Sequence, residues 1–387
     1  MINTYKRLPA DPADWFSPDE VAKAREYQRP LARARVLDGI ISTAVLAAIL
    51  LTHAVPRYLD AVGVGWWPAQ VVLTLLFLLV VSTVFDLPMA LWRTFVHEQR
   101  WGFNTQTPKG FVVDLVKGLV LNLVIMSVLL TAIWALIRAT DMWWLWGWGV
   151  VFVFSVGLGM LYPILIAPIF NRFTPLEDPE LVGRLRALAD RAKLAISEVL
   201  VMDASKRTRK DNAYFAGLGK TRRVVLFDNL LEQPPEAVEV VVAHEMGHWR
   251  RKHISRNLPL GAALTLAMFL FVRWLVTWEP ALDLAGVGSV REPAAIPLFL
   301  AAFVPFNLLV GLVQAWFSRA CERQADLEAL ELTGDPEAYR EMQRGLHTKN
   351  LADLAPGTWK YLRLSHPPAA ERLELSKIWE RERSAVR

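Results

Sequence analysis

Six long apolar stretches constrain the fold of this chain more than any other feature of its sequence. A helix needs about 20 apolar residues to cross the hydrocarbon core of a bilayer, which is about 30 Å thick. The stretches lie at residues 36–55, 66–92, 111–138, 143–170, 257–278 and 294–317. Within the fourth, Pro163 and Pro168 are expected to kink or end the helix. The sequence therefore predicts an integral, multi-pass membrane protein that is mainly α-helical and has the lipid bilayer as a partner.

The composition supports this prediction and excludes other classes of protein. Apolar residues make up 53% of the chain and charged residues 21%, against about 25% charged in ordinary globular proteins. A long disordered chain and a fully soluble enzyme are both excluded. The single cysteine, Cys321, excludes an intramolecular disulfide and a cysteine-based zinc site. The net charge of +5 fits basic residues on cytoplasmic loops facing an anionic leaflet, so no nucleic-acid partner is expected.

The distribution of Lys and Arg predicts the orientation in the membrane. The basic N-terminus, the 93–110 loop, residues 171–256 and the C-terminal tail all fall on one side of the six spans. The opposite loops contain little positive charge beyond Arg57 and Arg291. Because basic loops stay in the cytoplasm, both termini are expected there. The N-terminus also lacks the apolar stretch of a secretory signal.

The apolar stretches divide the chain into five parts. These are a polar N-terminus at 1–35, a four-span region at 36–170, a segment with a small β element at 171–256, a two-span region at 257–318 and a helical C-terminal part at 319–387. The 171–256 segment is predicted to contain a helix at 178–193, a strand at 197–204, a loop at 206–220, a strand at 221–231 and a helix beginning at Pro234–Pro235. The C-terminal part should break at Pro356–Gly357 and Pro367–Pro368.

The strongest motif is an HExxH, formed by His244, Glu245 and His248. On a helix, two histidines four residues apart project from one face and can bind one Zn²⁺. The adjacent Glu245 can take a proton from water at the metal. Such a motif arises by chance in under about 1% of chains with this composition. The motif therefore predicts a zinc site.

A catalytic zinc needs a third protein ligand, and cysteine is not available for it. The segment after the last span offers Glu322, followed four residues later by Asp326. On one helical face, Glu322 could bind zinc while Asp326 accepts a hydrogen bond from a ligand histidine and fixes its tautomer. An ordinary solvated helix is the alternative, since Glu328 and Glu331 are also nearby.

The other histidines are weaker candidates. His253 lies off the ligand face in a basic cluster and is expected at the membrane interface. His97 begins a similar motif, but Trp101 stands where the second histidine would be. His53 and His347 do not stand out. His366 precedes two prolines and could donate to an oxyanion, although a surface turn explains it equally well.

Several further stretches carry a resemblance to a known family. They are FVHEQRWGFNTQT, YPILIAPIFNRFTPL, SKR and NAYF, RRVVLFDNLL, SRACERQAD and SHPPAAERL, and with HEMGH they extend from about residue 22 to 375. In these the chain resembles the type I CAAX prenyl proteases, which are integral-membrane zinc metallopeptidases. The resemblance implies a ring of transmembrane helices around a large chamber, with an α+β zincin-like catalytic domain at the cytoplasmic face.

The resemblance also implies roles at the metal. His244, His248 and Glu322 match the ligands of one Zn²⁺ per subunit, and Glu245 matches the general base. Asp326 matches a second carboxylate that acts as a proton donor or orients a ligand histidine.

Five more residues match positions that the family uses around the substrate. Asn212, Ala213 and Tyr214 match the edge segment that holds the substrate backbone beside the metal. His366 and Arg372 match late positions associated with the tetrahedral intermediate and the substrate.

The expected function is hydrolysis of peptide bonds in a peptide or protein with a lipidated or hydrophobic C-terminus. Eukaryotic members have an additional N-terminal span, so we expect six spans here against their seven, and a bacterial cell membrane as the location. One alternative is an HtpX-like quality-control protease with broad specificity. Another is a catalytically silent membrane protein, against which the intact Glu245 argues, because a structural zinc site needs no base.

Overall fold

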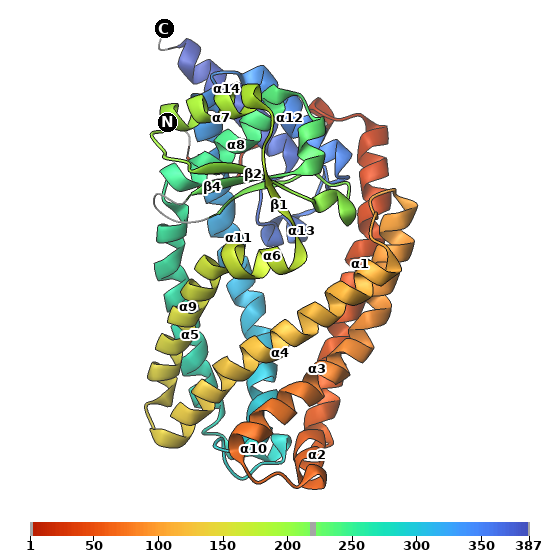
Figure 1. Cartoon of the computed structure of the whole chain (residues 1–387), viewed down its shortest axis with the longest axis vertical. Helices are drawn as coiled ribbons and strands as arrows, with labels where there is room; N and C mark the ends of the chain where they lie inside the picture. The colour runs from red at the N-terminus through yellow and green to blue at the C-terminus, as the bar shows by residue number, and fades with distance from the viewer. Residues whose placement is uncertain (1–2, 217–221, 386–387) are drawn as a thin grey trace.

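Long helices run beneath a smaller mixed domain in the computed structural model of the chain, which describes residues 3–216 and 222–385 (Figure 1). Within the described residues, six helical segments are long and apolar enough to cross a membrane. They are α1 (Pro18–Leu51), α3 with its continuation (Trp67–Glu98), α4 (Pro108–Ala139), α5 with α6 (Trp143–Phe170), α9 (His253–Leu275) and α11 with the turn before it (Pro293–Thr333). The six predicted spans are confirmed.

The prolines of the fourth span do not end its helix. α5 (Trp143–Leu161) passes into a π-helical segment at Tyr162–Ile166 and then into α6 (Ala167–Phe170). A proline removes one backbone donor and clashes with the preceding turn, and a widened π-helical turn is one way for a helix to continue past such a site. Pro88 lies in α3 (Trp67–Leu91) just before a second π-helical segment at Trp92–Glu98.

The spanning helices pack tightly only at the end far from the mixed domain. There, Trp134 of α4, Trp143 of α5 and Ile296 of α11 share one core with the short helices α2 (Ala54–Val62) and α10 (Glu279–Ala285). Nearer the mixed domain, the described helices bury no side chain over residues 75–91, 108–132, 148–166, 254–267 and 303–314. Tightly packed helices bury one face, so these lengths are packed less closely than the far end.

The mixed domain contains a four-stranded sheet with the order β1-β2-β4-β3. Its strands are β1 (Phe173–Pro175), β2 (Glu198–Met202), β3 (Ala213–Ala216) and β4 (Arg223–Phe227). β2 and β4 are parallel, and the two outer strands pair antiparallel to their neighbours. β3 is therefore a terminal strand, with one edge free of any described strand.

Two sequence predictions for this sheet need correction. The strand expected at 221–231 is β4 followed by a 3-10 turn at Asp228–Glu232, and Thr221 lies outside the described residues. The loop expected at 206–220 contains β3, while residues 217–220 lie outside the described part. The sequence did not predict β3 because its four residues show no clear alternation of apolar and polar side chains. They are extended because they pair with β4.

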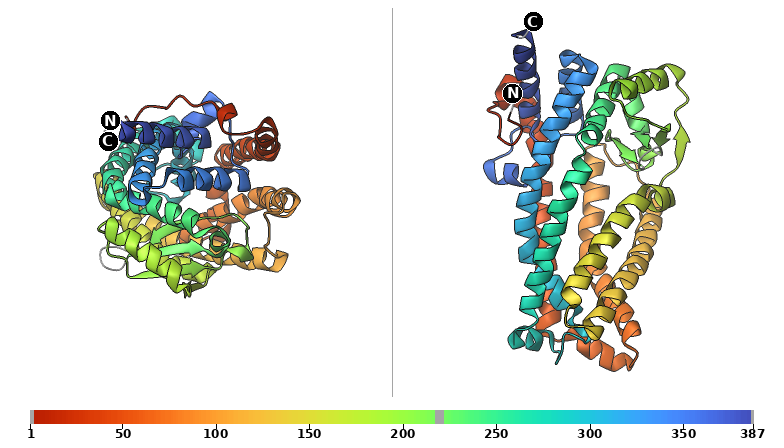
Figure 2. Two further views of the ribbon diagram at one scale, coloured as in Figure 1. Left: turned by 90° about the horizontal axis from the view of Figure 1, so that it is seen from above. Right: turned by 90° about the vertical axis from the view of Figure 1, so that its left-hand side faces the viewer.

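The helices of the mixed domain enclose the sheet and the site. They are α7 (Pro179–Arg191), α8 (Pro235–Arg250), α12 (Pro336–Lys349), α13 (Thr358–Arg363) and α14 (Ala369–Ser384). The predicted helix near 178–193 and the two C-terminal breaks are confirmed. α11 (Ile296–Thr333) continues from the spanning region into this domain without interruption, as Figure 2 shows beside α9. The first described residues and α14 lie at the same end of the molecule (Figure 2).

Candidate metal centre and cleft

The HExxH motif lies on α8, as its spacing predicts. Pro235 occupies the first turn, where its missing N–H costs nothing, and apolar residues lead from there to the motif. Gly247, inside the motif, faces α11 so closely that a Cβ there would lie 2.9 Å from the Ala325 Cα. The glycine therefore allows α8 and α11 to approach closely enough for side chains of both helices to meet at one point.

Three donor groups from these two helices converge. His244 Nε2 lies 3.2 Å from His248 Nε2, and the two nitrogens lie 3.2 and 3.4 Å from the Glu322 carboxylate oxygens. Tetrahedral Zn²⁺ with bonds of 2.0–2.1 Å to nitrogen and oxygen places its ligand atoms about 3.3 Å apart. The Glu322 Oε2 atom is buried without a hydrogen-bond partner, which is costly unless a cation binds it. These three residues fit a zinc ion in donor type, spacing and burial.

A buried ion pair holds His244. Its Nδ1 donates to the Asp326 carboxylate over 2.9 Å, the hydrogen bond that the Glu322–Asp326 spacing suggests. Arg372 makes two hydrogen bonds to the same carboxylate, one of 2.9 Å from Nε and one from Nη2. The Arg372 guanidinium compensates the charge of this fully buried carboxylate. Asp326 thereby fixes the tautomer in which His244 Nε2 is free to bind a metal.

His248 has a different support, which the sequence did not reveal. Its Nδ1 lies 2.9 Å from Nδ1 of His253, and His253 Nε2 lies 3.1 Å from Oε1 of Gln324. The prediction that His253 lies at the membrane interface is wrong, since only 2% of it is exposed. That prediction extended α8 past its end, whereas Lys252 adopts a left-handed conformation (φ 54°) that turns His253 back toward His248.

A cleft of about 240 Å³ opens at this centre. Glu245, Asn212 and Ala213 line it together with His244, His366 and Arg372. Burial raises the pKa of the Glu245 carboxyl, and the neighbouring histidines oppose this. A carboxyl with a raised pKa, beside the converging donors, is suited to accept and return a proton.

The structure separates the remaining candidates. His366 Nε2 lies 3.4 Å from Glu322 Oε1, and 58% of its side chain is exposed toward solvent. Tyr214 follows Ala213 on β3, so its side chain points to the opposite face of the sheet, where its hydroxyl meets Met202 Sδ at 3.9 Å. Of the edge segment, Asn212 and Ala213 line the cleft, and Tyr214 is not among its lining residues. His97 lies elsewhere, with its ring 4.9 Å from the ring centroid of Tyr27.

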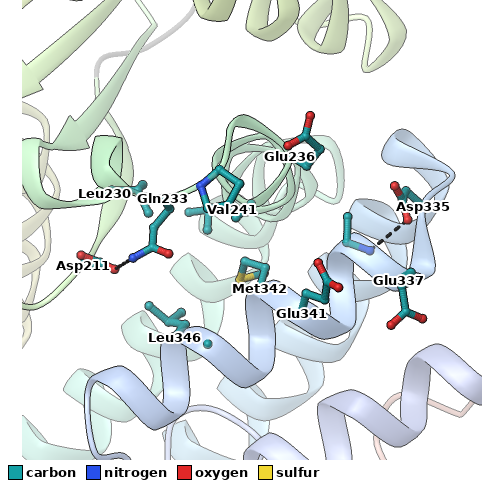
Figure 3. Close-up of a pocket in the computed structure, with 14 residues that line it drawn as sticks. Asp211, Leu230, Gln233, Glu236, Val241, Asp335, Glu337, Glu341, Met342 and Leu346 are labelled. Carbon is teal, nitrogen blue, oxygen red and sulfur yellow. Dashed lines mark hydrogen bonds between the residues drawn. The ribbon is translucent and has the colours of Figure 1, made fainter.

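A second cavity of about 390 Å³ shares part of the cleft's lining (Figure 3). Both are lined by Leu230, Val241 and Met342. Glu341 and Asp335 also line the second cavity. The two cavities therefore adjoin between α8 and α12.

The lowered pKa of His347, at the edge of the cleft, predicts that the protein loses stability in acid. Burial lowers its pKa to about 4, so the folded protein keeps the ring neutral while the unfolded chain protonates below about pH 6.5. Stability is then complete above pH 6.5 and is lost as the pH falls toward 4. We expect His347→Gln to recover about 1 kcal/mol of this loss at pH 5, because part of the ring remains accessible. Unfolding temperatures of both proteins at pH 5, 7 and 8.5 test this, and equal acid slopes would contradict it.

Two family models match the chain and together cover nearly all of it. Residues 1–172 match the model described as CAAX prenyl protease N-terminal, five membrane helices, and residues 175–379 match peptidase family M48. The chain belongs to the CAAX prenyl protease family. It is thus a membrane metalloprotease, and the matches do not favour the quality-control or silent alternatives. Within residues 3–172, the described structure contains four of the six candidate spans.

Individual members of the CAAX prenyl protease family align over almost the whole chain. The CAAX prenyl protease 1 homolog of Arabidopsis thaliana is 31% identical over 95% of this chain and 89% of its own length. CAAX prenyl protease 1 of Saccharomyces cerevisiae is 29% identical over 95% of this chain and 88% of its own. The crystal structure of S. mikatae Ste24p superposes with a TM-score of 0.86 at 28% identity, covering 96% of this chain and 92% of that one. These matches confirm the predicted fold class.

Proposed function

We propose that this chain is a zinc-dependent endopeptidase that cleaves peptide bonds at the cleft between α8, α11 and β3. One observation carries the proposal, namely the convergence of His244, His248 and Glu322 at tetrahedral spacing beside Glu245. The three residues would hold the ion, and Glu245 would act as the general base. Membership of a metalloprotease family supports the same chemistry.

The roles of the side chains follow from their positions. Zinc, when bound, supplies polarisation of the scissile carbonyl and a lower pKa for the attacking water. Glu245 takes a proton from that water and returns it to the leaving amine. His366 lies beside Glu322 with its ring accessible from the cleft, where it can donate to the developing oxyanion.

The substrate backbone would pair with β3. Apart from β4 it pairs with no described strand, and its first residue, Ala213, lines the cleft with Asn212. An added strand is bound through main-chain hydrogen bonds and tolerates many side chains. Arg372 lines the cleft and would act through the Asp326–His244 pair, since its Nε and Nη2 both donate to Asp326.

The natural substrate would carry a lipidated or hydrophobic C-terminus in a bacterial cell membrane, with the catalytic domain and both termini in the cytoplasm. The loosely packed lengths of the spanning helices support a hydrophobic tail as part of the substrate. The relatives named CAAX prenyl protease support a lipidated substrate. The basic residues 171–256 and the shared end of the two termini support the orientation.

Removal of zinc tests this function. Purified full-length protein in detergent is expected to cleave a farnesylated CAAX reporter peptide, to lose at least about 99% of that activity after chelation, and to regain it with one equivalent of Zn²⁺. If an unmodified peptide of the same sequence is cleaved more slowly, the enzyme recognises the lipid. If both peptides are cleaved equally, the zinc mechanism stands but the substrate needs no lipid.

His244→Ala is the matching genetic test, with His53→Ala as its control because His53 lies at the opposite end of the molecule, against Gly286. The first variant should bind no stoichiometric zinc and cleave neither peptide, while the second should behave as the wild type. Zinc-independent cleavage by His244→Ala would contradict the proposal.

A further inference from the structure

Residues 4–8, which we call the N-terminal strap, lie against the outer side of the metal centre. Gln324 Nε2 donates to Thr4 Oγ1 over 3.0 Å, and Arg323 Nη1 donates to the Thr4 carbonyl over 2.9 Å. Both of these partners directly follow the ligand Glu322 on α11. The strap thus contacts the helix turn that presents a zinc ligand.

A continuous chain of hydrogen bonds connects the strap to the other side of the centre. From Thr4 it passes through Gln324 to His253 over 3.1 Å, and from His253 to Nδ1 of His248 over 2.9 Å. Arg256 Nη1 also donates to Gln324 Oε1 over 2.8 Å, and its Nη2 donates to the Tyr5 hydroxyl over 2.8 Å. Two separate residues of the strap therefore meet this chain.

The donors along this chain can point in only one direction. Arg256 has no acceptor atom, so its contact identifies Oε1 of Gln324 as the acceptor. His253 must then donate from Nε2 to that oxygen. The two Nδ1 atoms lie 2.9 Å apart, so one donates and the other accepts, and an imidazole with its proton on Nε2 accepts at Nδ1. His248 consequently carries its proton on Nδ1, and its Nε2 is the free nitrogen, directed at His244 and Glu322.

We propose that the N-terminal strap is part of the zinc site, with Thr4, Gln324 and His253 acting as positioning residues that hold His248 in its metal-binding tautomer and orientation. This chain of hydrogen bonds fixes the tautomer of His248 as Asp326 fixes the tautomer of His244. Its members are neutral groups, and it extends to the surface of the protein. The inference rests on the zinc site of the proposed function and not on its peptidase activity.

Other contacts keep the strap in place. The Leu8 N–H donates to Glu371 Oε1 over 3.0 Å, and Arg323 Nε donates to the same oxygen over 2.8 Å. The Arg7 guanidinium lies 4.2 Å from the ring centroid of Tyr361, a distance at which cation–π attraction operates. The strap is thereby fixed to α11, α13 and α14 at once, so Thr4 is presented to Gln324 without needing the relay to order it.

The experiment measures zinc retention in full-length, zinc-loaded protein in detergent. Zinc transfer to a chromogenic chelator is timed for His253→Phe, Gln324→Leu and Thr4→Val, which remove one member of the chain each. Loss of an outer partner of a metal-binding histidine typically lowers metal affinity 10- to 100-fold. We expect transfer to accelerate about 10- to 100-fold for His253→Phe, about 10-fold for Gln324→Leu and a few-fold for Thr4→Val.

Two controls separate positioning from general loosening. Thr4→Ser keeps the hydroxyl and should retain zinc like the wild type. Arg344→Gln breaks the contacts of Arg344 with Trp15 and Glu20 near the N-terminus without touching the chain, and it should also retain zinc. Unfolding temperatures of the chelated proteins are measured in parallel and should be similar for Thr4→Val and Thr4→Ser.

Wild-type zinc retention in His253→Phe would overturn the proposal. So would faster loss from His253→Phe alone, with Gln324→Leu and Thr4→Val unchanged, because the strap would then have no part in it. Faster loss from Arg344→Gln, in proportion to its unfolding temperature, would also overturn it in favour of non-specific destabilisation. A protein that passes these tests and cleaves no peptide would refute the proposed function and leave the positioning role intact.

Discussion

Glu245→Gln is expected to reduce peptide hydrolysis by about 10²- to 10⁴-fold while zinc content stays at one per chain. Glutamine has nearly the same shape as glutamate but accepts no proton in this role. Glu245 lines the cleft and is not one of the three converging donors, so the metal centre should persist. Steady-state cleavage of the reporter peptide and metal analysis of the same sample measure both quantities.

The matched control is Glu331→Gln, which removes an exposed carboxylate from the same helix as Glu322, where it pairs with Arg383 at the surface. It should leave cleavage and zinc content unchanged. An active Glu245→Gln protein would refute the assigned base. Loss of zinc together with activity would show instead that Glu245 supports the metal centre.

Arg372→Met is expected to have the largest effect on stability. The substitution leaves the Asp326 carboxylate, which has no exposed surface, without its guanidinium partner. Breaking a buried ion pair by removing one partner costs about 3–5 kcal/mol, because the remaining charge is uncompensated. We expect the free energy of unfolding to fall by that amount and zinc retention to weaken, as measured by thermal unfolding and chelator competition.

Adding Asp326→Asn to Arg372→Met removes the uncompensated charge and should restore most of the lost stability. It should not restore zinc retention, because an amide holds His244 less firmly than a carboxylate does. Arg381→Met, at an exposed pair with Glu374, controls for loss of an arginine and should change stability by less than about 1 kcal/mol. Equal effects of the two arginine substitutions would contradict the buried-pair interpretation.

Much of this architecture was predictable because its signals are local. The six spans follow from length and hydropathy alone. Most of their ends lie near the predicted ones, but the first helix already begins at Pro18 and the last continues to Thr333, because polar helical residues extend both beyond their apolar stretches. The HExxH spacing predicts that His244 and His248 share one helical face, and the spacing of Glu322 and Asp326 does the same for α11. The structure brings both pairs together.

The parts that escaped prediction depend on long-range contacts or on a single backbone angle. Asp326 meets Arg372 across 46 residues, and only the resemblance drew attention to that arginine, as a substrate residue. His253 supports His248 because Lys252 interrupts the helix between them, and helical periodicity across a break points to the wrong face. Gln324 and Thr4 lie 320 residues apart, a separation at which sequence patterns carry no information.

Because α11 is uninterrupted, the protein cannot be divided into a membrane part and an independent catalytic part. The helix that carries Glu322 is rooted among the spanning helices, while His244 and His248 belong to the α8 segment outside them. No excised water-soluble fragment that ends before the last span can hold all three donors. A detergent that separates the spanning helices should therefore abolish activity, because it moves Glu322 away from His244 and His248. The sheet should remain folded and every covalent bond intact. The last spanning helix would thus itself supply one side of the proposed metal centre.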